Sequence, residues 1–277
     1  KQHRNMTFNK LGLPQSLLEL LNKENYKSAY PIQKEAIPIV LKGKDVLGIA
    51  QTGSGKTASY VLPILSTLNH KQRAKDRQVD VLVLVPTREL AEQVKDVFNL
   101  FEKGISNTVK TMAIYGGVSI NPQMKALFGV SVLVATPGRL LDLVNSNAVH
   151  FDKLQTLVLD EADKLLNLGF QDEMNQIFAL LPKKRQNLLF SATLNEKVEE
   201  INQILLRDPE LINVAPKEKN LDQIRQLAYA ISEEKKGPFL RHLIKSENMQ
   251  QVLIFTASTY KATHVADKLH KNGIDAR

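Results

Sequence analysis

The feature that most constrains the fold is an alternation of short, almost wholly apolar runs with longer stretches of helical periodicity. In residues 81–85 and 157–159 every side chain is Val or Leu. A strand of this kind presents no face to water, so it belongs in a sheet covered by helices on both faces. Strands that alternate with helices predict parallel βαβ units. We therefore predict an α/β fold, with a mostly parallel open sheet and helices on both faces.

Seven strands and seven helices are predicted in the first part of the chain. The strands are Asp45–Ala50, Asp80–Val85, Val109–Tyr115, Ser131–Ala135, Thr156–Asp160, Asn187–Ser191 and Leu211–Val214. The helices are Pro14–Asn22, Pro31–Leu41, Lys56–Leu68, Arg88–Phe101, Pro137–Val144, Glu173–Leu181 and Glu196–Leu206. Three of these helices begin with proline, which suits a first helical turn because its N–H groups have no partner there.

The pattern changes after Val214. Residues 216–223 are polar, include a proline and lack apolar periodicity, which is typical of a linker. Beyond them the pattern predicts strand, helix, strand and helix over Ile224–Ile231, Lys236–Ile244, Gln251–Thr256 and Tyr260–Asn272. One such segment is too short to bury both faces of a sheet. We predict a first domain over 1–215, a linker over 216–223 and an incomplete second α/β domain over 224–277.

Composition excludes some classes of protein. The chain has no cysteine, which rules out a disulfide framework and a thiolate metal site and fits a reducing compartment. No apolar run is long enough to span a bilayer, and residues 1–4 lack the apolar region of a signal peptide. We expect a cytoplasmic protein without a membrane partner. The net charge of +8 fits either a polyanionic partner or a solvated basic surface.

Residues 50–57, Ala-Gln-Thr-Gly-Ser-Gly-Lys-Thr, follow a predicted strand and open a predicted helix. Glycines there let successive N–H groups point at phosphate oxygens, and the helix N-terminus adds partial positive charge. Lys56 then reaches the β- and γ-phosphates, and the Thr57 hydroxyl ligates Mg²⁺. The general pattern begins with Gly where this chain has Ala50, so a chance Gly-rich loop is the alternative. The predicted nucleotide-binding residues are Gln51, Thr52, Gly53, Ser54, Gly55, Lys56 and Thr57.

Two carboxylates, Asp160 and Glu161, stand at the end of the predicted strand Thr156–Asp160. Ligand sites of open α/β sheets lie at this carboxyl edge. Asp160 is suited to bind Mg²⁺ through water, and Glu161 to orient or deprotonate an attacking water. Because side chains alternate along a strand, both roles require the strand to end at this point. The alternative, an acidic helix N-terminus, loses weight once the phosphate loop is considered with it.

Several short motifs together resemble the DEAD-box RNA helicase family. They occur in that family's order: Ala50–Thr57, Pro86–Leu90, Gly116–Gly117, Thr136–Arg139, Asp160–Asp163, Leu168–Phe170 and Ser191–Thr193. Residues 252–255 resemble the first strand motif of the family's second lobe. The resemblance covers essentially the whole chain. It implies a RecA-like P-loop NTPase lobe with an N-terminal Gln-motif extension, followed by the start of a second RecA-like lobe.

The resemblance also assigns an adenine site. It implies that Gln33 pairs with the adenine edge and that Phe8 stacks on the ring, with Tyr26 in the same motif. An amide both donates and accepts, so it matches the adenine edge chemically. The flanking residues depart from the family, which usually has Gly, Pro and Thr or Ser in place of Asn25, Ala29 and Tyr30. The alternative is that Gln33 is a solvated helix residue.

For RNA, the resemblance implies contacts from Pro86, Thr87, Arg88, Gly117, Thr136, Gly138 and Arg139. Hydroxyls, bare N–H groups and the arginine fork suit phosphates and read no bases. We expect sequence-independent binding of single-stranded or short duplex RNA. Alternatively, the two threonines are helix N-caps and Arg139 is a surface cation.

Ser191 and Thr193 are implied to couple the acidic motif to the RNA site. Their alternative role is to cap the helix that begins at Glu196.

The function we predict is that of an ATP-dependent RNA helicase with ATP and Mg²⁺ as cofactors, in which Lys56, Asp160 and Glu161 act in catalysis. Phosphoryl transfer also needs an arginine finger, which the family supplies from second-lobe motifs not found before Arg277. We therefore expect the fragment to bind nucleotide but to hydrolyse ATP poorly. The alternatives are an ATP-gated RNA clamp or scaffold, and another P-loop ATPase such as a DNA translocase.

Overall fold

The computed structural model describes residues 7–68, 76–106, 109–215 and 225–276. The chain divides into two compact units, Lys1–Glu218 and Lys219–Arg277, and each is described separately below. The predicted linker 216–223 lies outside the described residues. None of the helices within the described ranges is long and apolar enough to cross a membrane.

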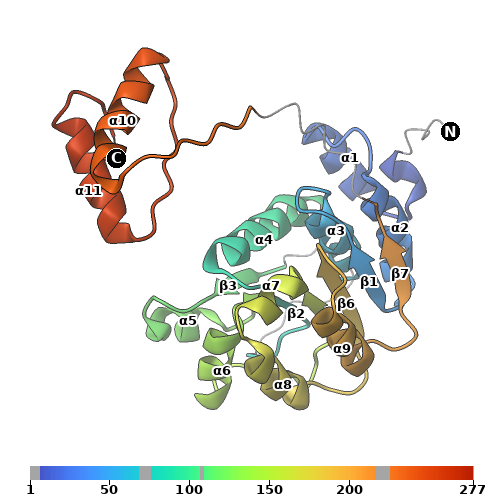
Figure 1. Ribbon diagram of the computed structural model, residues 1–277. Coiled ribbons are helices and arrows are strands. Elements are labelled where there is room, and N and C mark those ends of the chain that lie inside the picture. The colour runs from blue at the N-terminus through green and yellow to red at the C-terminus, as the bar shows by residue number, and fades with distance from the viewer. Residues whose placement is uncertain (1–6, 69–75, 107–108, 216–224, 277) are drawn as a thin grey trace. The chain divides into compact units, whose positions relative to one another are not determined.

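The first unit is built on a seven-stranded sheet of order β3-β4-β2-β5-β6-β1-β7 (Figure 1). Its strands are β1 (Val46–Ile49), β2 (Val81–Leu84), β3 (Thr111–Ile114), β4 (Val132–Ala135), β5 (Thr156–Leu159), β6 (Gln186–Ser191) and β7 (Glu210–Asn213). All six pairings between neighbouring strands are parallel. The predicted fold class and all seven predicted strands of this unit are confirmed.

Helices cover both faces of this sheet. One face packs against α1 (Gln15–Lys23), α2 (Pro31–Leu41), α3 (Lys56–Leu68) and α4 (Arg88–Phe101). The other packs against α5 (Ile120–Ala126), α6 (Pro137–Asn145), α7 (Ala162–Asn167), α8 (Gln171–Leu180) and α9 (Glu196–Leu205). Short 3-10 helices lie at Phe8–Lys10 and Glu102–Gly104. The sequence pattern missed α5, α7 and the two 3-10 segments, which are too short to show clear helical periodicity.

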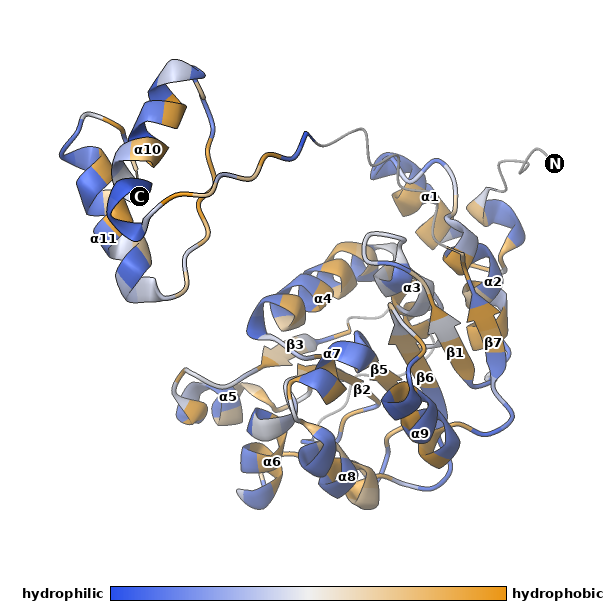
Figure 2. Cartoon of the chain, in the orientation of Figure 1, coloured by the Kyte–Doolittle hydropathy of each residue, from blue (hydrophilic) through white to orange (hydrophobic). Residues whose placement is uncertain are grey.

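The apolar strands are buried on both sides, as predicted. In β2, Val83 belongs to the core under α1–α4, while Leu82 and Leu84 belong to the core under α5–α9. Figure 2 shows the strands of the sheet mostly in the hydrophobic colour, whereas the helices mix both colours. Alternation of side chains along a strand thus serves two cores instead of one core and solvent.

The connections that follow β1 and β6 place a potential ligand site at the carboxyl edge of the sheet. The helix that follows β1, α3, packs on one face of the sheet, and α9, which follows the neighbouring strand β6, packs on the other. Connections that leave adjacent strands toward opposite faces form a topological switch point, where open α/β sheets bind ligands at the carboxyl ends of their strands.

The described residues of the second unit form two helices, α10 (Glu233–Ser246) and α11 (Thr259–His270), which confirms the two predicted helices. The two predicted strands, Ile224–Ile231 and Gln251–Thr256, are wrong: the residues described there form no strand. A strand exists only through hydrogen bonds to a neighbour, and the described residues of this unit form no ladder. The apolar run is accordingly uncovered, with Leu253 80% and Phe255 88% exposed.

Candidate nucleotide and RNA site

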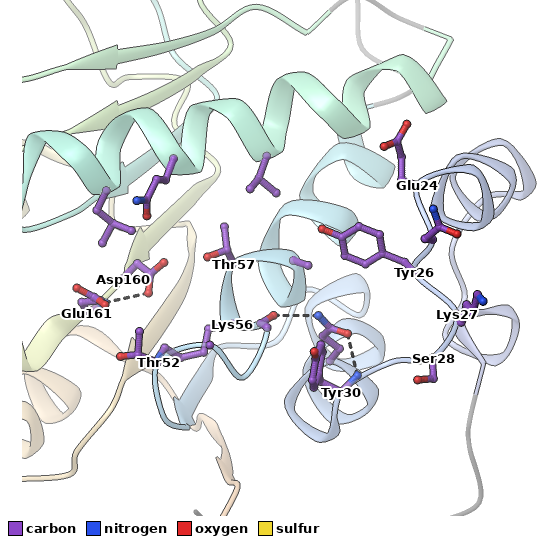
Figure 3. Close-up of a pocket in the computed structure, with 18 residues that line it drawn as sticks. Glu24, Tyr26, Lys27, Ser28, Tyr30, Thr52, Lys56, Thr57, Asp160 and Glu161 are labelled. Carbon is purple, nitrogen blue, oxygen red and sulfur yellow. Dashed lines mark hydrogen bonds between the residues drawn. The ribbon is translucent and has the colours of Figure 1, made fainter. Parts of the chain in front are cut away.

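A cavity of about 700 Å³ opens at the carboxyl ends of β1 and β5. Figure 3 shows Asp160, Glu161, Lys56 and Thr57 on one side of it and Tyr26 on the other. The walls come from four places in the sequence: the loop before α2, the phosphate loop, α4 and the acidic motif. The lining residues are Glu24, Asn25, Tyr26, Lys27, Ser28, Tyr30, Gln33, Thr52, Gly53, Gly55, Lys56, Thr57, Ala58, Leu90, Gln93, Val97, Asp160 and Glu161.

The phosphate loop has the backbone that its glycines predict. Gly53 and Gly55 adopt φ values of +80° and +88°, in the region that side chains disfavour. Lys56 is buried, and its Nζ donates to the Ala50 carbonyl at 2.6 Å. Burial lowers the pKa of Lys56, while the nearby charges of Asp160 and Glu161 oppose that shift. The ammonium is therefore held at the loop by one backbone acceptor and by the field of the acidic motif.

Asp160 and Glu161 both face the phosphate loop, because strand β5 ends just before them. Strand β5 stops at Leu159, and Glu161 adopts a left-handed conformation, with φ 52° and ψ 49°. Asp160 is 2% exposed and its Oδ1 accepts the Glu161 N–H at 2.9 Å. Burial raises the pKa of Asp160, against the lowering effects of Tyr60 and Lys56. Both carboxylates therefore line the same cavity despite being neighbours in sequence.

Sequence reasoning missed the cavity residues of α4, Leu90, Gln93 and Val97, and it missed Tyr60, which contacts Asp160 without lining the cavity. The Tyr60 hydroxyl donates to Asp160 Oδ2 at 2.8 Å, and its ring lies against Phe190 at a centroid distance of 5.4 Å. Burial and the Asp160 charge raise the pKa of Tyr60 well above its usual value. The sequence signal is weak: Tyr60 lies four residues after Lys56, and positions i and i+4 share a helix face, but this spacing does not indicate Asp160 as the partner.

The predicted adenine residues are only partly brought together. Gln33 is 1% exposed and lines the cavity, so the interpretation as a solvated helix residue is wrong. Its Oε1 accepts the Tyr30 N–H at 2.9 Å and its Nε2 donates to the Gly55 carbonyl at 3.1 Å. Tyr26 lines the cavity and meets Phe101 edge to face. Phe8 lies in the hydrophobic core and is not among the lining residues.

The residues present fit a magnesium nucleotide. A Cβ at Gly53 would meet nothing within 4 Å, so the loop is open toward a ligand at that position. The Ser54 hydroxyl oxygen is buried without a hydrogen-bond partner among the described residues. The described residues contain no group of three or more His, Cys, Asp or Glu side chains placed to hold a metal. Mg²⁺ bound with phosphates needs only one or two carboxylates from the protein, and the cavity lining contains Asp160 and Glu161 together with the Thr57 hydroxyl.

The motif at the end of β6 contacts the acidic motif directly. Thr193 Oγ1 donates to Asp163 Oδ2 at 3.1 Å, and Ser191 Oγ donates to the Thr193 carbonyl at 2.8 Å. The cap of α9 is provided by Asn195, whose side chain accepts the Val198 N–H at 3.0 Å. The alternative role of Ser191 and Thr193 as caps of this helix is therefore wrong.

Comparison with known proteins assigns the family. The sequence profile of the DEAD/DEAH box helicases matches residues 30–201. The chain belongs to this family. It is 38% identical over 272 residues to the DEAD-box ATP-dependent RNA helicase CshA of Streptococcus pneumoniae, covering 98% of this chain and 51% of that protein. It is 37% identical over 266 residues to the DEAD-box ATP-dependent RNA helicase RhpA of Helicobacter pylori, covering 96% and 52%.

A solved structure agrees with this assignment. The DEAD box protein from the hyperthermophile Methanococcus jannaschii superposes with a TM-score of 0.69 at 30% identity, over 98% of this chain and 72% of that one. The predicted family and the RecA-like fold are thus confirmed. The chain spans about half the length of the curated DEAD-box relatives described above.

The RNA contacts predicted for this DEAD-box chain follow the ends of β2, β3 and β4. After β2, Pro86 is buried, and Thr87 caps α4 by accepting the Leu90 N–H at 3.2 Å. Its role as an N-cap is therefore confirmed. Arg88 is exposed, and its guanidinium lies 5.8 Å from the centre of the Tyr115 ring.

After β4, Arg139 is 9% exposed, so its interpretation as a surface cation is wrong. Its Nη2 donates to the Val118 carbonyl at 2.8 Å, which ties it to the exposed loop that carries Gly117 at φ +81°. Thr136 and Gly138 are half-buried, and Thr136 makes no side-chain cap bond to α6. The threonine hydroxyl is therefore not committed to the helix that follows.

Proposed function

We propose that the first unit binds ATP with Mg²⁺ in the cavity between the phosphate loop and the acidic motif. One observation carries the proposal: Lys56, Thr57, Asp160 and Glu161, from two segments about a hundred residues apart, line a single cavity. A chance Gly-rich loop would have no reason to face two carboxylates. Lys56 and the N–H groups of residues 52–57 would hold the phosphates, and Thr57 and Asp160 would hold the metal.

In the same proposal, Glu161 orients the attacking water and accepts its proton. Its left-handed backbone turns it toward the cavity, and its carboxylate pairs with Lys164 at 2.8 Å. The metal, when bound, neutralises charge on the phosphate oxygens. The base at the end of the nucleotide would lie toward Gln33 and Tyr26, which line the far part of the cavity.

The adenine end is the weaker part of the fit. Gln33 already bonds two backbone groups, so recognition of a base through this amide would use its second N–H and second lone pair. Phe8 would have to leave the core to stack on a base. We retain Gln33 and Tyr26 as base contacts and keep Phe8 as a prediction from the family alone.

For the whole protein we propose ATP-dependent remodelling of RNA, as the names of the relatives CshA and RhpA indicate for those proteins. RNA phosphates would lie along the ends of β2, β3 and β4, where Arg88 and Gly117 are exposed. The contact between Thr193 and Asp163 joins the end of β6 to the acidic motif, and we propose that this pair passes the state of the nucleotide site to the RNA contacts. An ATP-gated RNA clamp would use the same residues, and strand release is the property that separates the two functions.

The first experiment is calorimetric titration of the chain with ADP and ATP in the presence of Mg²⁺. Binding that is tighter in Mg²⁺ than in EDTA and prefers adenine to guanine nucleotides supports the proposal. Absence of binding at millimolar nucleotide contradicts it. Because the arginine motifs of a second lobe are not found within residues 1–277, we also propose slow turnover by this chain alone. Fast steady-state hydrolysis would contradict that part.

The choice between RNA and DNA is tested with matched strands of one sequence. Tighter binding of the RNA strand in the presence of nucleotide supports the RNA assignment, because the two strands differ in the 2′-hydroxyl. Equal binding of both would favour another P-loop ATPase such as a DNA translocase.

A further inference from the structure

Tyr60 is a buried polar residue that neither the sequence motifs nor the proposed chemistry accounts for. It lies on α3, is fully buried, and packs its ring against Phe190. A tyrosine in an apolar core usually directs its hydroxyl to a partner. Here the partner is Asp160 Oδ2, at 2.8 Å. The hydroxyl of Tyr60, on the helix that follows the phosphate loop, therefore holds the carboxylate of Asp160 in the acidic motif.

The geometry leaves Asp160 able to bind a cation. A carboxylate offers about four acceptor sites, and the bonds from Tyr60 and from the Glu161 N–H take one on each oxygen of Asp160. Acceptor capacity therefore remains on both oxygens. With two donors fixing it, the side chain is held in one rotamer before any ligand arrives. Without the Tyr60 hydroxyl, only the Glu161 N–H would hold the Asp160 carboxylate, through one of its two oxygens.

Helix α3 places Tyr60 in register with the other groups that face the nucleotide. Lys56 and Thr57 stand at its first turn, and Tyr60 follows one turn later on the same side. A single rigid element thus carries the phosphate-binding lysine, the magnesium-binding hydroxyl and the hydroxyl that orients the carboxylate on β5. Any movement of α3 relative to β5 must stretch the bond from Tyr60 to Asp160.

We infer that Tyr60 is a positioning residue for magnesium, which orients the Asp160 carboxylate so that Mg²⁺ binds it together with the nucleotide. This inference rests on the proposed function. Outer partners of metal ligands commonly change metal affinity by about 10- to 100-fold when removed. We expect Tyr60→Phe, which keeps the ring and its packing, to weaken nucleotide binding in Mg²⁺ about tenfold. Binding in EDTA should not change, because the two side chains that the Tyr60 hydroxyl contacts, Asp160 and Thr57, are both proposed metal ligands.

The test is calorimetric titration with ADP, once in Mg²⁺ and once in EDTA, for the unaltered chain, Tyr60→Phe and a matched control. The control is Tyr115→Phe, which removes another phenol bonded to a carboxylate, that of Glu92, at the same distance of 2.8 Å. Selective loss of the Mg²⁺-dependent gain in Tyr60→Phe supports the inference. Retention of that gain, or an equal loss in Mg²⁺ and EDTA, overturns it. An unaltered chain without any Mg²⁺-dependent gain overturns the proposed function instead.

Two further measurements guard against a folding artefact. In an Asp160→Asn background, Tyr60→Phe should have no further effect on binding in Mg²⁺, because contacting residues that act as a unit are not additive. Additive losses would overturn the inference. If Tyr60→Phe does not fold, a crystal structure of the unaltered chain with Mg²⁺ and ADP decides. A retained hydrogen bond between Tyr60 and Asp160 supports the role, and a broken one overturns it.

Discussion

The nucleotide cavity and the predicted RNA edge lie on the same side of one sheet but are built in opposite ways. In the cavity, Lys56 and Asp160 are buried and fixed by hydrogen bonds to other parts of the protein. Lys56 donates to the Ala50 carbonyl, and Asp160 accepts from the Tyr60 hydroxyl and the Glu161 N–H. At the edge, Arg139 is buried and donates to the Val118 carbonyl, whereas Arg88 and Gly117 are exposed and, among the described residues, Arg88 contacts only the partly exposed side chains of Glu89 and Tyr115. The difference indicates that the cavity is preorganised for one ligand shape, whereas the edge can adapt to a flexible phosphate chain.

This comparison predicts how substitutions should behave. A change in the cavity removes a group that has no substitute, so single effects should be large. A change at the edge removes one of several similar phosphate contacts, so single effects should be small and cumulative. The predictions below run from the largest expected effect to the smallest.

Glu161→Gln should have the largest effect, on turnover. It removes the proposed general base, a group that typically contributes about 10²- to 10⁴-fold, and it retains the shape of the side chain. We expect ATP hydrolysis under single-turnover conditions to fall by about 10² or more, with ADP affinity unchanged. Lys164→Gln is the control, since it removes the ion pair with Glu161 and leaves the carboxylate. Equal losses in both variants would show that the ion pair matters and the carboxylate does not.

Lys56→Ala should have the second largest effect, on the affinity for ADP. The variant removes a buried ammonium that lines the cavity. Hydrogen bonds to charged groups contribute about 1.5–3 kcal/mol, so calorimetry should show ADP binding about 10- to 100-fold weaker. Lys153→Ala is the control, because that lysine pairs with Asp76 on the surface at 2.9 Å, where such pairs contribute little. Unchanged ADP affinity in Lys56→Ala would place the phosphates elsewhere.

Lys56, Asp160 and Tyr60 show how much of the candidate site could be predicted from the sequence alone. The place of Lys56 and Asp160 at the cavity was predictable from their position: Lys56 opens a helix after a buried strand, and Asp160 follows the end of a buried strand. Tyr60 was not singled out, because its partner is 100 residues away and a tyrosine at a buried helical position usually indicates core. Local pattern predicts the ends of elements well, whereas contacts across the sheet need the strand order.

The second unit also shows the limit of local sequence patterns, because here a strand was predicted and none is observed among the described residues. Residues 251–256 have a strand's pattern, but the pattern states only a preference for pairing. Without a ladder among the described residues, the segment stays exposed at Leu253 and Phe255. The RNA edge is intermediate: Thr87 was predictable as a cap, whereas the burial of Arg139 depends on the loop after β3, to which it donates at Val118.

Gly55→Ala should produce an intermediate effect, on stability and affinity together. A Cβ there would lie 2.4 Å from Gln33 Nε2, and φ is +88°. A left-handed conformation costs a residue with a side chain about 1–2 kcal/mol, and the displaced Gln33 adds to this. Gly43→Ala is a matched control, since its φ is +74° and an added Cβ would have no atom within 4 Å. We expect a larger loss of thermal stability in Gly55→Ala, with weaker ADP binding in that variant alone. Equal losses would mean that the contact with Gln33 is unimportant.

Arg88→Ala should have the smallest effect, and it tests the adaptable side of the comparison. Loss of one phosphate contact should weaken RNA binding only several-fold for every sequence, and should reduce the slope of log affinity against log salt by about one. Fluorescence anisotropy with a single-stranded RNA, over a range of salt concentrations, measures both. Lys184→Ala is the charge-matched control, because this exposed lysine precedes β6 and so lies at the opposite edge of the parallel sheet. If both variants lose RNA affinity equally, binding reflects the net charge of the chain, and the edge is not a site. If Arg88→Ala alone abolishes binding, the edge depends on a single contact, as we expect of the nucleotide cavity, and it is not adaptable.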